Sequence, residues 1–129
     1  DVLVTQIVAP KISSLKRLFF RKRAARAAID FPLANAALAW HSDGQVRLAV
    51  GAMSSEAFFL DDTAAFISQL LRAGEPLPEN LGEMAEKEAR RNMRPIKEAT
   101  VSPAVKIKAM IAVVREVLAD LRRGLGEND

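Results

Sequence analysis

The dipeptide Asp43-Gly44 lies between two segments with the composition of β-strands, at about 32–41 and 45–53. An Asp-Gly pair is a strong signal for a two-residue hairpin, because both central positions of a type I′ turn need a positive φ angle. Apolar residues alternate with more polar or smaller ones in the second segment, so one face of that strand is expected to be buried. The alternating apolar residues are Val46, Leu48 and Val50. The chain must therefore accommodate antiparallel β-structure.

A further strand is expected at residues 2–9, which are rich in Val, Ile and Thr. This segment stops at Pro10, a residue that cannot donate a hydrogen bond within a sheet.

Residues 17–23 fit two patterns. Strand alternation places Leu18, Phe20 and Lys22 on one face, whereas periodicity alone slightly favours a helix that continues through Ala28. The alanines after Arg23 are good helix formers, which adds weight to the helical alternative.

Three helices are expected in the second half of the chain, at about 61–73, 78–93 and 103–123. The residues expected to define their ends are Asp61 and Gly74 for the first, Pro78 for the second, and Ser102, Pro103 and Gly124 for the third. Because the strands come first and the helices follow, we expect an α+β fold. It would have an antiparallel sheet of three to four strands, covered by about three helices on one face.

Length and composition are those of one domain. The chain has 129 residues, of which 50% are hydrophobic, and this is enough for a single two-layer core. It has no cysteine, so disulfides, thiolate zinc sites and iron–sulfur ligation are excluded within this sequence. No segment has the pattern of a signal peptide or of a membrane span, and we expect a cytoplasmic location. Since the sequence opens at Asp1 in an apolar segment, we expect residues 1–129 to be a C-terminal fragment of a longer polypeptide.

Positive charge is concentrated in one part of the chain. The net charge is only +3, yet no acidic residue interrupts a block that contains Lys11, Lys16, Arg17, Arg21, Lys22, Arg23 and Arg26. Such a block indicates an anion nearby.

Four segments together resemble one protein family. They are 3–10, which ends in Ile-Val-Ala-Pro; 20–33, in which Lys22, Arg26 and Asp30 recur at four-residue steps; 47–52, which ends the second hairpin strand at a glycine; and 95–102, which leads to the last helix. The resemblance is to the C-terminal domain of the FAD-binding (medium) subunit of molybdenum hydroxylases. This family includes xanthine dehydrogenase and the carbon monoxide dehydrogenase flavoprotein. The sequence departs from the family pattern at 54–57 and at 98–106.

The resemblance implies a strand at 17–23 followed by an irregular turn. It also implies that Lys22 projects toward a flavin, with Leu3 or Val4 of the first strand packed near it. An ammonium beside FAD would stabilise the bound and the reduced cofactor. We expect Arg26 and Asp30 to form an ion pair that supports the Lys22 segment.

The resemblance further implies the cofactors and partners. FAD would be bound mostly by upstream domains of the same subunit, which this sequence lacks. The molybdenum cofactor and the iron–sulfur clusters would lie on a molybdenum subunit and an iron–sulfur subunit. The isolated domain would then be part of an oxidoreductase without being catalytically active, and no catalytic residue or metal site is expected in it.

Other interpretations of these residues stay open. Lys22 can belong to a solvated basic face, and the segment from Lys11 to Arg26 can serve a module that binds nucleic acid or a protein partner. Aromatic residues for stacking on bases are few in this segment. The single histidine, His41, is expected at the surface near the hairpin turn, and helix capping explains Asp61-Asp62 better than a metal site does.

Overall fold

The hairpin around Gly44 forms the centre of a four-stranded sheet in the computed structural model, which describes Gln6, Val8 and residues 13–24, 32–53, 56–94 and 102–126. Its strands are β2 (Pro32–His41) and β3 (Val46–Gly51), which pair antiparallel with Leu38 opposite Leu48. The turn differs from the two-residue type I′ prediction. The Gly44 amide donates to the His41 carbonyl at 3.0 Å, and among the central residues only Gly44 has a positive φ, of 89°. A three-residue loop with a left-handed glycine accounts for both observations.

The sheet has the order β1-β2-β3-β4 and is antiparallel throughout. Strand β1 (Leu15–Ala24) confirms the strand assignment at 17–23 and excludes the helical alternative there. Strand β4 (Phe58–Phe59) has two residues and was not predicted. The strand predicted at 2–9 lies outside the described residues except for Gln6 and Val8, which belong to no strand.

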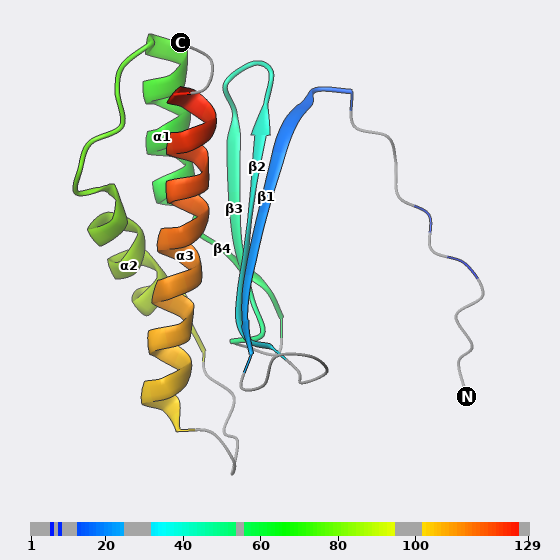
Figure 1. Cartoon of the computed structure of the whole chain (residues 1–129), viewed down its shortest axis with the longest axis vertical. Helices are drawn as coiled ribbons and strands as arrows, with labels where there is room; N and C mark the ends of the chain where they lie inside the picture. The colour runs from blue at the N-terminus through cyan, green and yellow to red at the C-terminus, as the bar shows by residue number, and fades with distance from the viewer. Residues whose placement is uncertain are drawn as a thin grey trace.

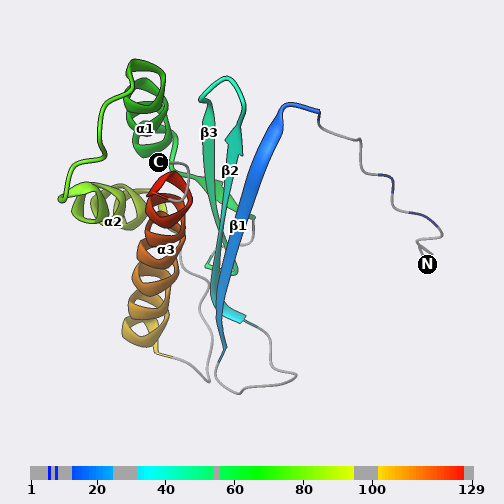
Figure 2. The same cartoon turned by 45° about the horizontal axis from the view of Figure 1, so that its top comes forward.

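Three helices follow the sheet: α1 (Asp61–Ala73), α2 (Leu81–Asn92) and α3 (Pro103–Gly126). They lie together on one side of the sheet, and α3 runs along β1 and β2 (Figure 1; Figure 2). The predicted α+β class, with helices on one face of an antiparallel sheet, is therefore confirmed. No helix in the described ranges is both long and apolar enough to cross a membrane.

The ends of α1 are set partly by a neighbouring helix. Gly74 has the expected left-handed conformation, with a φ of 70°, and its amide donates to carbonyls of the last turn. The predicted cap at Asp61 is wrong, because the N-cap residue is Leu60 and Asp61 is already helical. The carboxylate of Glu88 in α2 accepts hydrogen bonds of 2.8 Å from the amides of Asp62 and Thr63 instead. A side chain distant in sequence thus supplies the acceptors that a local cap would provide.

The other two helices also differ from prediction at one end each. Helix α2 begins at Leu81 and not at Pro78, whose carbonyl accepts the Leu81 amide in a preceding turn. Ser102 caps α3 as predicted, since its hydroxyl accepts the Val105 amide at 3.3 Å. Helix α3 continues past Gly124 to Gly126.

Small residues let α3 approach the sheet closely. A Cβ atom on Gly124 would lie only 3.2 Å from the Phe19 ring, so this glycine serves packing and not helix termination. The inward side chains of β2 and β3 and the sheet-facing side of α3 form a large part of the core, to which α1 and α2 also contribute. Those from the sheet and α3 include Ala34, Ala36, Leu38, Trp40, Val46, Leu48, Val50, Met110, Val113, Val114, Val117 and Leu121.

Candidate functional site

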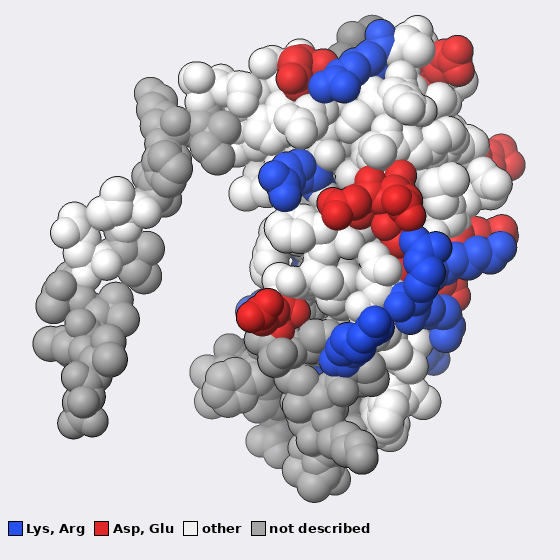
Figure 3. Space-filling view, turned by 180° about the vertical axis from the view of Figure 1, so that it is seen from behind, with Lys and Arg blue, Asp and Glu red and all other residues white. Residues whose placement is uncertain are grey.

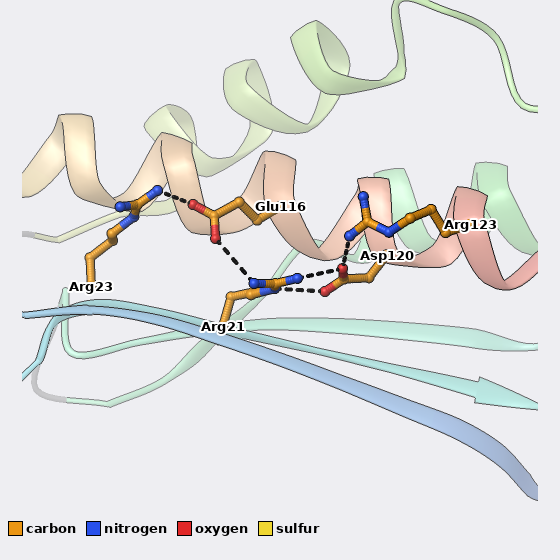
Figure 4. Close-up of polar contacts among 5 residues, drawn as sticks. All are labelled: Arg21, Arg23, Glu116, Asp120 and Arg123. Atoms are coloured by element: carbon orange, nitrogen blue, oxygen red, sulfur yellow. Dashed lines mark hydrogen bonds and ion pairs between the residues drawn. The ribbon is translucent and has the colours of Figure 1, made fainter.

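Strand β1 presents basic residues on both of its faces, and the two faces have different surroundings. Arg21 and Arg23 point toward α3, where Arg21 meets Asp120 and Arg23 forms an ion pair with Glu116 (Figure 4). Lys22 lies between them in sequence and so points to the opposite side of the sheet. The alternation predicted for this segment is therefore observed.

The inward face carries an ion-pair network. Arg21 donates from Nε and Nη2 to the two carboxylate oxygens of Asp120, each at 2.8 Å, and Nη1 lies 4.0 Å from Glu116. Arg123, one turn further along α3, also bonds Asp120 (Figure 4). The hydrogen bond from Arg21 is the main reason why the pKa of Asp120 lies below its ordinary value. The same pair raises the pKa of Arg21. These arginines attach an edge strand to the last helix.

Two further cations of the basic block contact aromatic rings. The Lys16 ammonium lies 4.3 Å from the centre of the Trp40 ring, and the Arg17 guanidinium lies 5.2 Å from that of Phe19. Lys11 and Arg26 lie outside the described residues. Among the described cations of the block, Lys22 is thus the one with no ion pair, hydrogen bond or ring contact to another described residue.

Lys22 lies on the side of the sheet turned away from the helices, which we call the outer face. Its residues are Leu18, Phe20 and Lys22 of β1, Leu33, Asn35, Ala37, Ala39 and His41 of β2, Arg47, Ala49 and Gly51 of β3, and Phe59 of β4. Lys22 is exposed and pairs in register with Asn35, which in turn pairs with Gly51. A cation and an amide therefore stand next to each other on an accessible surface.

Gly51 makes room for the Asn35 side chain. A Cβ atom at Gly51 would lie 2.3 Å from the Asn35 Oδ1 atom, so the amide lies across the backbone of β3. A larger residue at 51 would push this amide off the sheet or turn it away.

The structure does not bring together all the residues predicted for the site. Leu3, Val4, Arg26 and Asp30 lie outside the described residues, so their proximity to Lys22 and the ion pair between Arg26 and Asp30 stay predictions. His41 is partly exposed, and its Nδ1 lies 3.0 Å from the Ser14 hydroxyl. The described residues contain no group of three or more side chains able to hold a metal ion.

Sequence reasoning missed the apolar part of the outer face. Phe20 and Phe59 are 56% and 43% exposed, and both lie on this face. The alternation of β1 places Phe20 beside Lys22, but nothing in the sequence shows that Phe59 joins the same surface, because β4 has only two residues. Arg47 lies over the Phe59 ring at 4.8 Å.

The charge distribution bears on the alternative interpretation in which the segment from Lys11 to Arg26 binds nucleic acid. Figure 3 shows that acidic side chains lie directly beside basic ones on the side seen from behind, so this side is not uniformly basic. Arg21 and Arg23 already pair with carboxylates of α3. These contacts reduce the positive charge that the block can offer to phosphates.

Comparison with solved structures identifies the class of fold: it is shared with chains of quinoline 2-oxidoreductase and of carbon monoxide dehydrogenases. The structure of quinoline 2-oxidoreductase from Pseudomonas putida 86 matches with a TM-score of 0.66 and 21% sequence identity, over 83% of this chain. Carbon monoxide dehydrogenase from Hydrogenophaga pseudoflava, in a form that lacks the molybdopyranopterin moiety of its cofactor, matches with a TM-score of 0.60 and 16% identity. Reconstituted carbon monoxide dehydrogenase from Oligotropha carboxidovorans matches with a TM-score of 0.61 and 14% sequence identity. Both carbon monoxide dehydrogenases match over 77% of this chain.

The resemblance noted in the sequence is thus confirmed at the level of the fold. The match covers only 37% of the quinoline 2-oxidoreductase chain and 34% of the carbon monoxide dehydrogenase chains. No protein-family model and no curated protein gives a match to this sequence.

Proposed function

We propose that this chain is the C-terminal domain of the FAD-binding subunit of a molybdenum hydroxylase, an oxidoreductase related to xanthine dehydrogenase. In such an enzyme a substrate is oxidised at the molybdenum cofactor, and electrons pass through iron–sulfur clusters to FAD. The domain would complete one wall of the flavin site and help to dock the subunit against the molybdenum and iron–sulfur subunits. The observation that carries this proposal is the shared fold, which extends over about four-fifths of the chain in the first neighbour.

Lys22 is the residue of this chain that we assign to the flavin. It is exposed and has no ion-pair partner among the described residues, so none of these residues competes with a ligand for its ammonium. FAD, when bound, would supply the redox chemistry, and its reduced ring and its pyrophosphate carry negative charge. A cation beside Asn35 on an accessible sheet face fits such a group.

The remaining assignments concern residues around Lys22. Leu3 or Val4 would pack against the cofactor, and an ion pair between Arg26 and Asp30 would hold the segment after β1. None of these residues takes part in the chemistry. No glycine-rich phosphate-binding loop occurs in the sequence, so the pyrophosphate would be held by upstream domains.

The proposal is tested by making this chain with and without the sequence that precedes it. The chain alone should fold and be colourless, since one cationic wall cannot hold a dinucleotide whose phosphates are bound elsewhere. The extended polypeptide should retain FAD in a one-to-one ratio, measured by flavin absorbance after release from the protein. An extended polypeptide that folds and holds no flavin would refute the assignment.

A further inference from the structure

Strand β1 leaves one edge of the sheet open. It stands first in the sheet order, and no strand pairs with its other side among the residues that the structure describes. Most of its residues are exposed. We call this side of β1 the free edge. A long unpaired edge presents a row of N–H and C=O groups to which a further strand can bond.

The pairing of the sheet shows which backbone groups face the free edge. On β3, the Val46 amide donates to the Ser68 hydroxyl at 2.9 Å. The Leu48 carbonyl accepts the Leu60 amide, also at 2.9 Å, so both residues of β3 direct their backbone groups away from β2. Successive residues of an antiparallel strand bond to alternate sides, and the register carries this alternation across β2 to β1. The residues whose N–H and C=O groups face the free edge are therefore Leu18, Phe20 and Lys22.

A pocket of about 320 Å³ adjoins the free edge on the side of the helices. Its charged lining residues are Arg17 and Arg21 of β1 and Asp120 and Arg123 of α3. A strand added at the free edge would alternate its side chains as β1 does. Every second side chain of such a strand would therefore point to the helical side, where this pocket lies.

The charge on this side of β1 is unbalanced. The ion-pair network consists of three arginines and two carboxylates, namely Arg21, Arg23, Arg123, Glu116 and Asp120 (Figure 4). Arg17, whose guanidinium lies 5.2 Å from the centre of the Phe19 ring, adds a fourth cation to the wall of the pocket. Among the described residues here, four cations thus face two anions. An incoming carboxylate is favoured by this surplus, and an incoming cation is disfavoured.

The free edge fits an extended polypeptide better than a nucleic acid. It offers donors and acceptors in alternation, and the backbone of an extended peptide supplies a partner for both. The phosphates of a nucleic acid only accept hydrogen bonds, so the carbonyl groups of the edge would stay without a donor.

Charge also selects among polypeptides. A second copy that paired through its own β1 would bring together two strands with five cations each and no carboxylate. The segment at 2–9, where a strand is expected, contains no acidic residue that could enter the pocket. Positive charge on an edge strand normally prevents pairing between copies. Here the same charge leaves an acidic strand as the matching partner.

We propose that the free edge of β1 binds an extended acidic segment of a partner protein, which adds a fifth strand to the sheet. The backbone groups of Leu18, Phe20 and Lys22 bond the segment. One of its Glu or Asp side chains enters the pocket, where it meets Arg17 and Arg123. The inference goes beyond the proposed function and does not depend on flavin binding, since it uses the edge of the sheet and its helical side.

The test uses the chain itself, with a synthetic peptide of alternating Val and Glu as the probe and amide hydrogen exchange by NMR as the measurement. In the chain alone, the Leu18 and Phe20 amides should exchange fast, whereas those of Phe19 and Arg21, which face β2, should exchange slowly. Excess peptide should slow the Leu18 and Phe20 amides by roughly ten-fold or more. Unchanged exchange at these two amides would overturn the proposal.

Modified peptides separate backbone pairing from simple charge attraction, and they leave the protein unaltered. An extended segment bonds through alternate residues, so N-methylation of one set, either the valines or the glutamates, should abolish binding. Binding that survives methylation of either set would show that charge alone holds the peptide, and would contradict the proposal. A peptide with Lys in place of Glu should not bind, and equal affinity for it would also contradict the proposal.

Two variants of the chain test the pocket. Arg17→Gln should weaken binding of the Val-Glu peptide roughly ten-fold, as expected when one charged partner of a hydrogen bond is removed. Arg90→Gln is the matched control, because it removes the same charge from α2, where Arg90 bonds Glu86. It should leave the affinity unchanged. Equal losses for the two variants would rule out a specific role of the pocket and overturn this part of the proposal.

Two further outcomes would favour another occupant. Dimerisation of the chain that the Val-Glu peptide reverses would overturn the proposal in favour of a second copy at the free edge. Protection of the Leu18 and Phe20 amides by single-stranded oligothymidine, and not by the peptide, would overturn it in favour of nucleic acid.

Discussion

Arg21 of β1 and Asp120 of α3 form a bidentate ion pair, with both hydrogen bonds at 2.8 Å. The pair joins residues 99 positions apart in sequence. It attaches an edge strand whose inward side chains include three arginines where a core strand would carry apolar residues.

Asp120→Asn should destabilise the chain by about 1 kcal/mol, because the substitution removes charge-assisted hydrogen bonds that are partly screened by solvent. The loss should appear as a lower urea midpoint with an unchanged slope. Glu116→Gln is the matched control on the same helix. Its partner Arg23 is 55% exposed, so the loss should be smaller. A larger effect at Glu116 than at Asp120 would show that the Arg21 contact is not the main attachment of β1.

The same pair predicts the acid sensitivity of the fold. The pKa of Asp120 in the folded chain lies below its ordinary value of 3.8, chiefly because of the Arg21 hydrogen bond. The stabilisation is therefore fully present above that value and is lost as the pH falls through the lower folded pKa. The difference in unfolding free energy between the unaltered chain and Asp120→Asn should hence shrink as the pH drops below about 4. A difference that grows with acidification would contradict this sign.

Glu88→Ala should cost about 1–2 kcal/mol, because the amides of Asp62 and Thr63 lose their acceptor in a buried place. Glu88 itself is only 4% exposed. Thermal unfolding followed by circular dichroism is the measurement, and Glu83→Ala on the exposed side of the same helix is the control. If both variants melt alike, Glu88 does not cap α1.

Much of the fold follows from local patterns. The strand at 17–23, by contrast, was chosen from the family resemblance, because periodicity alone slightly favoured a helix. Gly74 and Ser102 marked helix ends correctly. These features depend on neighbouring residues, which the sequence displays directly. The errors arise where a distant residue decides. Glu88 takes the capping role expected of Asp61, and the packing of Phe19 explains Gly124.

The candidate site was predictable only in part for the same reason. Lys22 could be selected because its spacing to Arg26 and Asp30 matches a family pattern. The apolar outer face could not be selected, since it assembles side chains from four strands and one of these strands has only two residues. Register, and not composition, makes Phe20 and Phe59 part of one surface.

Flavin retention by Lys22→Ala and Arg23→Ala, compared in the extended polypeptide, tests the central claim most directly. Lys22 faces the outer side and has no partner among the described residues, whereas Arg23 pairs with Glu116 on the helical side. Lys22→Ala should therefore weaken FAD binding, or lower the flavin reduction potential, by about 1–3 kcal/mol, the range of a charge-assisted contact. Arg23→Ala should leave both quantities unchanged and only lower the stability slightly. Equal losses for the two variants, or no loss for Lys22→Ala, would contradict the placement of Lys22 beside the flavin.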